Sequence, residues 1–188
     1  MRLLKLDPYD ILRHFYPDDT PLRRVLLKHS EQVREKALDI LKKTSLSLDS
    51  DLVSIGALLH DIGIFRCHAP SIFCTGTEPY IAHGILGAAM LRTYGNEIGL
   101  DLEPFARICE RHTGAGLSAK EILEQKLPLP ARDLLPETPE EKLICFADKF
   151  FSKSGSMEEK TVEKVRRSLE KFGPDTLTRF DELKKIFD

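Results

Sequence analysis

The stretch from Asp51 to Gly63 constrains the fold more than any other, because it is apolar almost all round and contains His60 and Asp61 near its end. Such a segment predicts a helix buried at the centre of a domain. Both ionisable side chains lose their water on folding, and a buried, unpaired carboxylate costs several kcal/mol or becomes protonated. A metal ion bound by both side chains would remove that cost. A buried, hydrogen-bonded His–Asp pair is the alternative that this stretch leaves open.

The rest of the chain predicts an all-α fold. Apolar residues recur at intervals of three and four, and the sequence contains no β-run, internal repeat or low-complexity segment. The segment 65–79 has no clear period and is expected to be a loop with at most a turn of helix. Helices are expected from Pro8 to about Pro17, Thr20 to about Thr44, Tyr80 to Tyr94 with Gly95 as the stop, Pro104 to His112, Ser118 to about Lys126, Thr138 to Phe151, Glu158 to Phe172 and Pro174 to Phe187.

Several polar side chains fall on the apolar stripes of these helices. His29, His83 and His112 each continue the stripe of a different helix, and Asp148 lies on the apolar face of another. Taken alone, an inward histidine is more often a hydrogen-bonded core residue than a metal ligand. A buried aspartate requires a cation, and the neighbouring Lys149 is one candidate for it.

Length and charge limit the kinds of protein to consider. The 188 residues fit a single domain, 1–188, with a metal-binding core at about 22–151. The C-terminal helices, 157–187, are expected to pack on this core or on a partner copy, so a homodimer stays open. The formal net charge is −2, which gives no electrostatic footprint for polymeric nucleic acid.

The cysteines and the apolar runs indicate the compartment. Four scattered cysteines form no Cys-x-x-Cys pair, so they are expected to be reduced thiols. The sequence shows no signal peptide and no run long enough to span a bilayer. It therefore predicts a cytoplasmic protein without membrane contact.

The inward polar residues form a larger set than chance burial explains. Six ionisable side chains are expected to point inward from five helices: His29, His60, Asp61, His83, His112 and Asp148. This set has enough ligands for two transition-metal ions and more than one ion requires. Adjacent residues on a helix point about 100° apart, so His60 and Asp61 could contact different sides of one ion, or Asp61 could bridge two. A metal site between the central helices is the expectation.

The order of these residues resembles the HD superfamily of metal-dependent phosphohydrolases, in its HDIG subgroup. The resemblance is carried by His29, by His60-Asp61-Ile62-Gly63 and by Asp148 within Ala147-Asp148-Lys149, and it spans about residues 22–151. It implies an HD-domain helical bundle with His60 and Asp61 at the centre of catalysis. It also implies a first metal held by His29, His60, Asp61 and Asp148, and a second held by His83 and His112 with Asp61 as the bridge.

Two further contexts narrow the resemblance. His83-Gly84 and His112-Thr113-Gly114 are similar to the branch that hydrolyses diadenosine tetraphosphate and related nucleotides. That branch usually has a lysine shortly after the His-Asp pair, whereas here Ile62-Gly63-Ile64-Phe65 precedes Arg66. The Gly-Tyr-Pro signature of cyclic-dinucleotide phosphodiesterases is absent, which argues against that substrate.

The resemblance implies a hydrolase of a small phosphorylated molecule, with a nucleotide as the expected substrate, that uses a metal-bound hydroxide. Fe or Mn is favoured over Mg because the site is rich in histidine, and Ni, Co and Zn are further candidates. Arg66, Arg111 and Lys149 are the expected contacts to phosphoryl oxygens. Two rival interpretations stay open: an HD-type di-iron oxygenase, and a binding module that keeps its metals only for structure.

Overall fold

Helices form nearly all the regular structure of the protein, as the sequence predicts. The computed structural model describes residues 7–188. The α-helices are α1 (Pro8–Phe15), α2 (Pro21–Lys43), α3 (Ser50–Leu59), α4 (His83–Ile98), α5 (Glu103–Arg111), α6 (Ala119–Glu124), α7 (Pro139–Asp148), α8 (Val162–Leu169) and α9 (Pro174–Phe187). Short 3₁₀ turns are η1 (Ile64–Arg66), η2 (Pro70–Ile72), η3 (Tyr80–Ala82) and η4 (Glu170–Phe172). A small antiparallel hairpin pairs β1 (His68–Ala69) with β2 (Cys74–Thr75).

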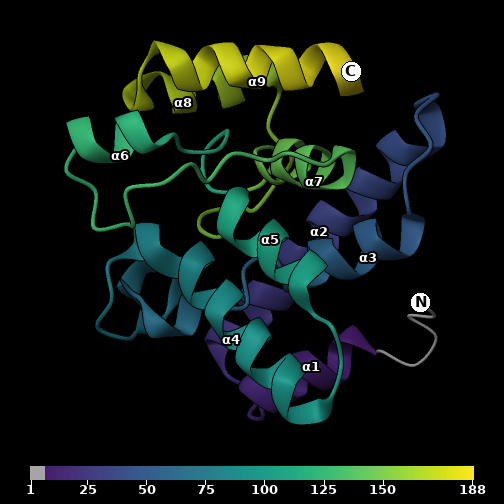
Figure 1. Cartoon of the computed structure of the whole chain (residues 1–188), viewed down its shortest axis with the longest axis vertical. Helices are drawn as coiled ribbons and strands as arrows, with labels where there is room; N and C mark the ends of the chain where they lie inside the picture. Colours follow the sequence, from purple (N-terminus) through teal and green to yellow (C-terminus); the bar gives the residue numbers. More distant parts are fainter. Residues whose placement is uncertain (1–6) are drawn as a thin grey trace.

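α3, which covers most of the apolar stretch from Asp51 to Gly63, lies at the centre of the fold. α3 packs against α2, α5 and α7, and α4 packs along α5. α8 and α9 lie across one end of the molecule, α1 and one end of α4 lie at the other, and α5 lies between them (Figure 1). Segments far apart in the sequence therefore meet around α3.

Side-chain caps fix the start of several helices where the sequence predicts them. Thr20 accepts a hydrogen bond from the backbone N–H of Arg23 at the start of α2. Reciprocal capping boxes begin α6, with Ser118 and Glu121, and α7, with Thr138 and Glu141. These starts are confirmed because each depends on a local contact that the sequence contains.

Some helix ends differ from the sequence prediction. The central helix ends at Leu59, so His60 and Asp61 lie in the turn that follows it and not on the helix. The helix expected to stop at Gly95 continues to Ile98 and ends at Gly99, which adopts the left-handed conformation with φ +69°. The missing side chain of Gly95 leaves room for the turn that follows. A Cβ there would lie 2.7 Å from the carbonyl oxygen of Leu100.

Two more boundaries and one loop are corrected in the C-terminal half and the middle of the chain. α7 ends at Asp148, three residues before the expected Phe151, and the helix expected from Glu158 begins only at Val162. The expected loop 65–79 contains 3₁₀ turns and the β1–β2 hairpin. The end of α7 was placed too late because Phe150 and Phe151 continue the helical spacing of apolar residues, although the backbone there already forms a turn.

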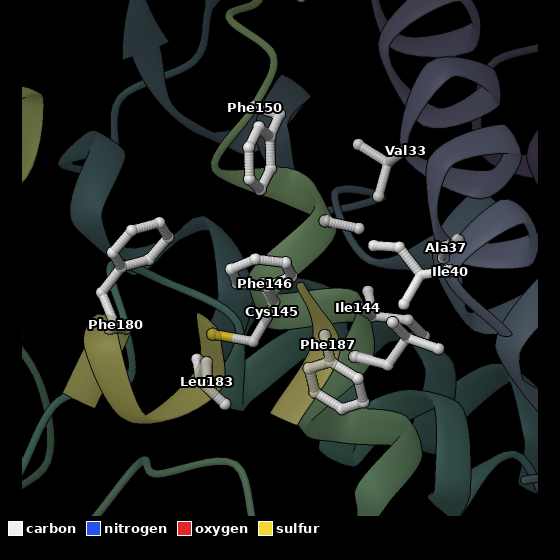
Figure 2. Close-up of a cluster of buried hydrophobic side chains, with 14 of the residues drawn as sticks. Val33, Ala37, Ile40, Ile144, Cys145, Phe146, Phe150, Phe180, Leu183 and Phe187 are labelled. Atoms are coloured by element: carbon white, nitrogen blue, oxygen red, sulfur yellow. The ribbon is translucent and has the colours of Figure 1, made fainter. Parts of the chain in front are cut away.

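Two large clusters of buried apolar side chains form most of the core within residues 7–188, and a small third cluster contains Leu117, Ile122 and Leu134. In the first, Phe146 on α7 has its ring centre 5.5 Å from that of Phe180 and 5.9 Å from that of Phe187, both on α9 (Figure 2). Val33, Ala37 and Ile40 of α2 belong to the same cluster. The second cluster joins α1, α4 and α5 to the ends of α2 and α3: Ile11, Leu26, Leu59, Leu91 and Phe105 are members. Because His60 follows Leu59 and Asp148 follows Ala147, the candidate site lies where the two clusters meet.

Gly63 allows α4 to lie against the turn after α3. Its φ angle of −82° is ordinary, so space is the constraint. A Cβ at this position would lie 2.3 Å from the carbonyl oxygen of His83 and 2.5 Å from the backbone nitrogen of Gly87. The missing side chain brings the start of α4, and with it His83, close to Asp61.

Within residues 7–188, no helix combines the length and the apolar character needed to cross a bilayer. The four cysteines are buried and form no disulfide, which agrees with the expected reduced thiols.

Candidate metal centre

The six ionisable side chains named from the sequence meet at one place. His29 comes from α2, His60 and Asp61 from the turn after α3, His83 from the start of α4, His112 from the end of α5 and Asp148 from the end of α7. All six are buried. Their ligand atoms form two overlapping groups, each within 4.8 Å: His29, His60, Asp61 and Asp148, and Asp61, His83 and His112.

Asp61 belongs to both groups and faces each with a different oxygen. Its Oδ2 lies 3.0 Å from His60 Nε2 and 3.2 Å from His29 Nε2. Its Oδ1 lies 3.3 Å from His83 Nε2 and 3.4 Å from His112 Nε2. This arrangement suits a carboxylate that bridges two cations.

Backbone carbonyls determine which ring nitrogen carries the proton in three of the histidines. In each, Nδ1 faces the carbonyl oxygen three residues earlier: His60 and Ala57 at 2.7 Å, His83 and Tyr80 at 2.6 Å, and His112 and Cys109 at 2.7 Å. A carbonyl only accepts, so each Nδ1 is protonated and donates. In the neutral rings Nε2 is therefore left with a lone pair, which is the form that binds a metal.

Several of these donor atoms form no hydrogen bond within the chain, and Asp61 Oδ2 faces only ion-pair partners, among them Lys153 Nζ at 2.6 Å. The Nε2 atoms of His83 and His112 face each other at 3.0 Å, and in the neutral rings neither has a hydrogen to place between them. His60 Nε2 and both oxygens of Asp61 are buried without a hydrogen bond of acceptable geometry. Buried polar atoms are normally satisfied, so orphaned atoms need an explanation. A nitrogen- and oxygen-rich donor set of this kind fits divalent transition-metal ions.

The surroundings move the pKa values of the histidines in opposite directions. Burial alone would lower the pKa of His60, but the carboxylates of Asp61 and Asp148 outweigh it and raise that pKa to about 9. Burial lowers the pKa of His83 to about 3, and it also lowers the pKa of His112. Without metal, His60 is thus cationic at neutral pH while the other two are neutral.

The two carboxylates stay ionised despite their burial. Burial alone would raise both pKa values, yet the charges of His60 and Lys153 hold the pKa of Asp61 well below its ordinary value. For Asp148 the charge of Lys149 has the same effect. Both aspartates are therefore available as anionic ligands at neutral pH.

Metal binding at His60 is expected to release about one proton per protein at pH 7.5, because a cation at Nε2 displaces the proton that the raised pKa retains. Isothermal titration of Mn(II) in buffers of different ionisation enthalpy measures this release. It should disappear above pH 10, where the ring is already neutral. A binding enthalpy that is independent of the buffer at pH 7.5 would contradict the assignment.

Two lysines lie beside the clustered carboxylates. Lys149 Nζ lies 2.6 Å from Asp148 Oδ2 and donates to the carbonyl oxygen of His112 at 3.1 Å. Lys153 Nζ lies 2.6 Å from Asp61 Oδ2. Lys149 is expected from the sequence, whereas Lys153 is not, because Lys153 lies in an irregular segment where no periodicity predicts the direction of a side chain. Its position four residues after Lys149 is the one signal that could have found it.

Two cavities adjoin the cluster, and both lysines line each of them. One has a volume of about 400 Å³ and is also lined by His83, His112 and Asp148. The other, of about 440 Å³, shares Asp148 and opens beside the β1–β2 hairpin. A small molecule in either cavity can therefore reach the edge of the cluster.

The structure does not bring the two expected arginines to the cluster. Arg66 is exposed and lines a different cavity, together with His14 and Tyr94. Arg111 is buried and already engaged, since its Nη1 donates to the carbonyl oxygen of Leu135 and lies 2.8 Å from Glu137 Oε1. Neither residue lines the two cavities beside the cluster, so both expected phosphate contacts are dropped in favour of the lysines.

Known proteins share the segment that holds this cluster. An uncharacterized protein, MJ0778, of Methanocaldococcus jannaschii is 39% identical over 146 residues, which cover 77% of this chain and 75% of that protein. The tRNA (cytidine(56)-2'-O)-methyltransferases of Thermoplasma volcanium and Picrophilus torridus are each 36% identical, over 127 and 128 residues. These matches cover 68% of this chain but only 32% of each methyltransferase. No solved structure matches significantly.

The family match agrees with the geometry. The HD domain matches residues 26–152, a range that contains all six clustered side chains and reaches from α2 to the residue after Phe151. The helical architecture and the buried His/Asp cluster agree with that match. The chain belongs to the HD domain family.

Proposed function

We propose that this protein is a metal-dependent phosphohydrolase that acts on a small phosphate ester or anhydride. The HD domain points to the superfamily of metal-dependent phosphohydrolases. The observation that carries the proposal is Asp61, whose two oxygens face two groups of buried histidines. One divalent ion would be held by His29, His60, Asp61 and Asp148, and a second by Asp61, His83 and His112. Fe or Mn is favoured by the histidine content, with Ni, Co or Zn as alternatives.

Divalent ions bound there would supply Lewis acidity and a water acidified towards neutral pH. The chain itself supplies the orientation and the remaining charge. The carbonyl partners of His60, His83 and His112 hold the three rings with Nε2 turned to the cluster. Lys149 and Lys153 place two ammonium groups at its edge, where phosphoryl oxygens would accept charge-assisted hydrogen bonds.

Lys153→Gln is expected to lower kcat/KM for a phosphate ester roughly 10- to 100-fold, the effect of losing one hydrogen bond to a charged group. Lys164→Gln, at an exposed position on α8, is the matched control and should leave kcat/KM unchanged. Because Lys153 also contacts Asp61, metal content must be measured in each variant. Unchanged kcat/KM in Lys153→Gln would remove this residue from the proposed phosphate site.

The test of the function is reconstitution. Purified protein loaded in turn with Fe(II), Mn(II), Co(II) or Ni(II) is expected to release phosphate from members of a panel of nucleotides and simple phosphate esters. An absence of phosphate release with every metal and every compound would contradict the proposal. Consumption of dioxygen with mixed-valence iron would favour the di-iron oxygenase instead. Tight metal binding without turnover, together with unfolding of a His60→Ala variant, would favour the purely structural role.

A small substrate is part of the proposal, and the resemblance to the HDIG subgroup and its diadenosine tetraphosphate hydrolase branch makes a nucleotide one candidate for it. The tRNA in the names of two relatives belongs to proteins of which this chain matches about a third. The net charge of −2 gives the chain no overall positive charge that would attract a polynucleotide. We propose a cytoplasmic enzyme without nucleic-acid partners, and a homodimer stays open.

A further inference from the structure

Two chemically different sets of side chains line the cavity of about 400 Å³ beside the cluster. One set consists of the ionisable groups already described, including His83, His112 and Lys149. The other set contains four apolar residues, namely Ile81, Leu117, Leu169 and Phe172. The volume falls within the range of about 300–1,000 Å³ that is usual for small-molecule sites.

The apolar residues offer few partners for a polar ligand. The uncharged side chains with hydroxyls that line this cavity are those of Tyr80, Thr113 and Thr176. The hydroxyl of Thr176 already donates to Glu121 Oε1 at 3.3 Å. A nucleobase carries several donors and acceptors, and burying them against this wall would leave most of them unsatisfied. Hydrocarbon or aryl groups carry no such penalty.

Part of this wall lies outside the segment that the HD domain family matches. Leu169 ends α8, Phe172 belongs to η4 and Thr176 lies on α9, whereas the family match ends at residue 152. The C-terminal helices lie across one end of the molecule (Figure 1), and their segment contributes Leu169, Phe172 and Thr176 to the lining of this cavity. They therefore add an apolar boundary that the HD segment alone does not supply.

We propose that this cavity binds the organic part of the substrate and that this part is apolar, so that the substrate is a phosphate monoester of a hydrophobic alcohol. The inference rests on the proposed phosphohydrolase function and narrows its substrate class away from nucleotides. The phosphate lies at Lys149, Lys153 and the clustered ligands. The hydrocarbon extends towards Phe172 and Ile81.

A series of n-alkylphosphonates tests the assignment through binding alone. These compounds keep the dianionic head group, and a phosphohydrolase cannot hydrolyse their C–P bond. With the Mn(II)-loaded protein, calorimetry should show affinity that rises about threefold for each added methylene, or on the order of 100-fold from methyl- to hexylphosphonate. Hexylphosphonate should also bind more tightly than adenosine 5′-monophosphate. Affinity that is independent of chain length, or tighter binding of the nucleotide, would overturn the assignment.

Two variants locate the effect in the molecule. Phe172→Ala is expected to reduce the affinity for hexylphosphonate about tenfold, with a loss that grows with chain length. Phe73→Ala is the matched control, because Phe73 is 53% exposed at the hairpin and lines neither cavity beside the cluster. An equal loss for every chain length in Phe172→Ala would count against the cavity. Should this variant fail to fold, the chain-length series on the unaltered protein still decides.

Hydrolysis of methyl and hexyl phosphate separates this inference from the proposed function. If hexyl phosphate is hydrolysed with a higher kcat/KM than methyl phosphate, the phosphohydrolase function and the apolar cavity assignment are both supported. If affinity rises with chain length but no ester releases phosphate, the hydrolase fails while the apolar cavity stands. If both esters are hydrolysed equally and affinity does not follow chain length, the hydrolase stands and the apolar cavity assignment fails.

Discussion

Asp61→Asn is expected to remove metal from both groups of the cluster and to reduce phosphate release at least about 10³-fold, the scale seen when one essential charged group is lost. The reason is geometric, because Asp61 Oδ2 lies next to the Nε2 atoms of His29 and His60, while Asp61 Oδ1 lies next to those of His83 and His112. Asparagine keeps the shape but loses the charge and one acceptor. Metal content by mass spectrometry and phosphate release are the two measurements.

Two further variants make this expectation specific. Asp148→Asn should weaken only the group that includes His29 and His60, because Asp148 does not belong to the second group. Asp51→Asn, an exposed aspartate at the start of α3, should change neither metal content nor phosphate release. Circular dichroism establishes that each variant is folded. Retention of two ions per chain in Asp61→Asn would contradict the bridging role.

Gly63→Ala is expected to destabilise the protein by about 3 kcal/mol, the upper end of the usual cost of overpacking. The added Cβ meets the backbone atoms of His83 and Gly87 at 2.3 and 2.5 Å, and backbone atoms cannot change rotamer to yield. α4 must therefore move and carry His83 away from Asp61. Denaturant unfolding should show the loss, which corresponds to roughly 6–12 °C in Tm for a chain of this size.

A second glycine provides the control for this effect. Gly99 adopts φ +69° at the end of α4, and a Cβ there would have no atom within 4 Å. Asparagine tolerates this conformation, so Gly99→Asn should cost less than about 1 kcal/mol. Gly63→Ala should also lower metal occupancy at His83 and His112, whereas Gly99→Asn should not. Equal stability of the two variants would show that the close approach is not a constraint.

The fold could be predicted where local contacts decide it. Thr20, Ser118 and Thr138 begin helices through hydrogen bonds to residues three positions later, and the sequence contains both partners. Gly95 was misread as a helix stop because the sequence offers two glycines four residues apart, and it is Gly99 that takes the left-handed conformation and ends α4. The turn that begins at His60 could not be predicted either, because the apolar residues continue through it without a helix stop signal.

The candidate site was predictable to the extent that it lies on regular helices. His29, His83, His112 and Asp148 could be assigned an inward direction from helical periodicity, and the structure brings them together with Asp61. The cationic side chains that would contact a phosphate group could not be predicted in this way. Arg66 was favoured by its closeness in sequence to His60, yet it faces another cavity. Lys153 was missed because irregular backbone carries no period.

The orienting carbonyls of His60, His83 and His112 lie only three residues before each ring. Each ring is therefore oriented by a single turn of its own segment. His29 is the exception, because its Nδ1 has no hydrogen-bond partner. The ligand set itself is complete only where five distant segments pack together, so an ion bound by it holds those segments to one another. We expect the metal supply to govern how much folded protein accumulates, and not only how active it is.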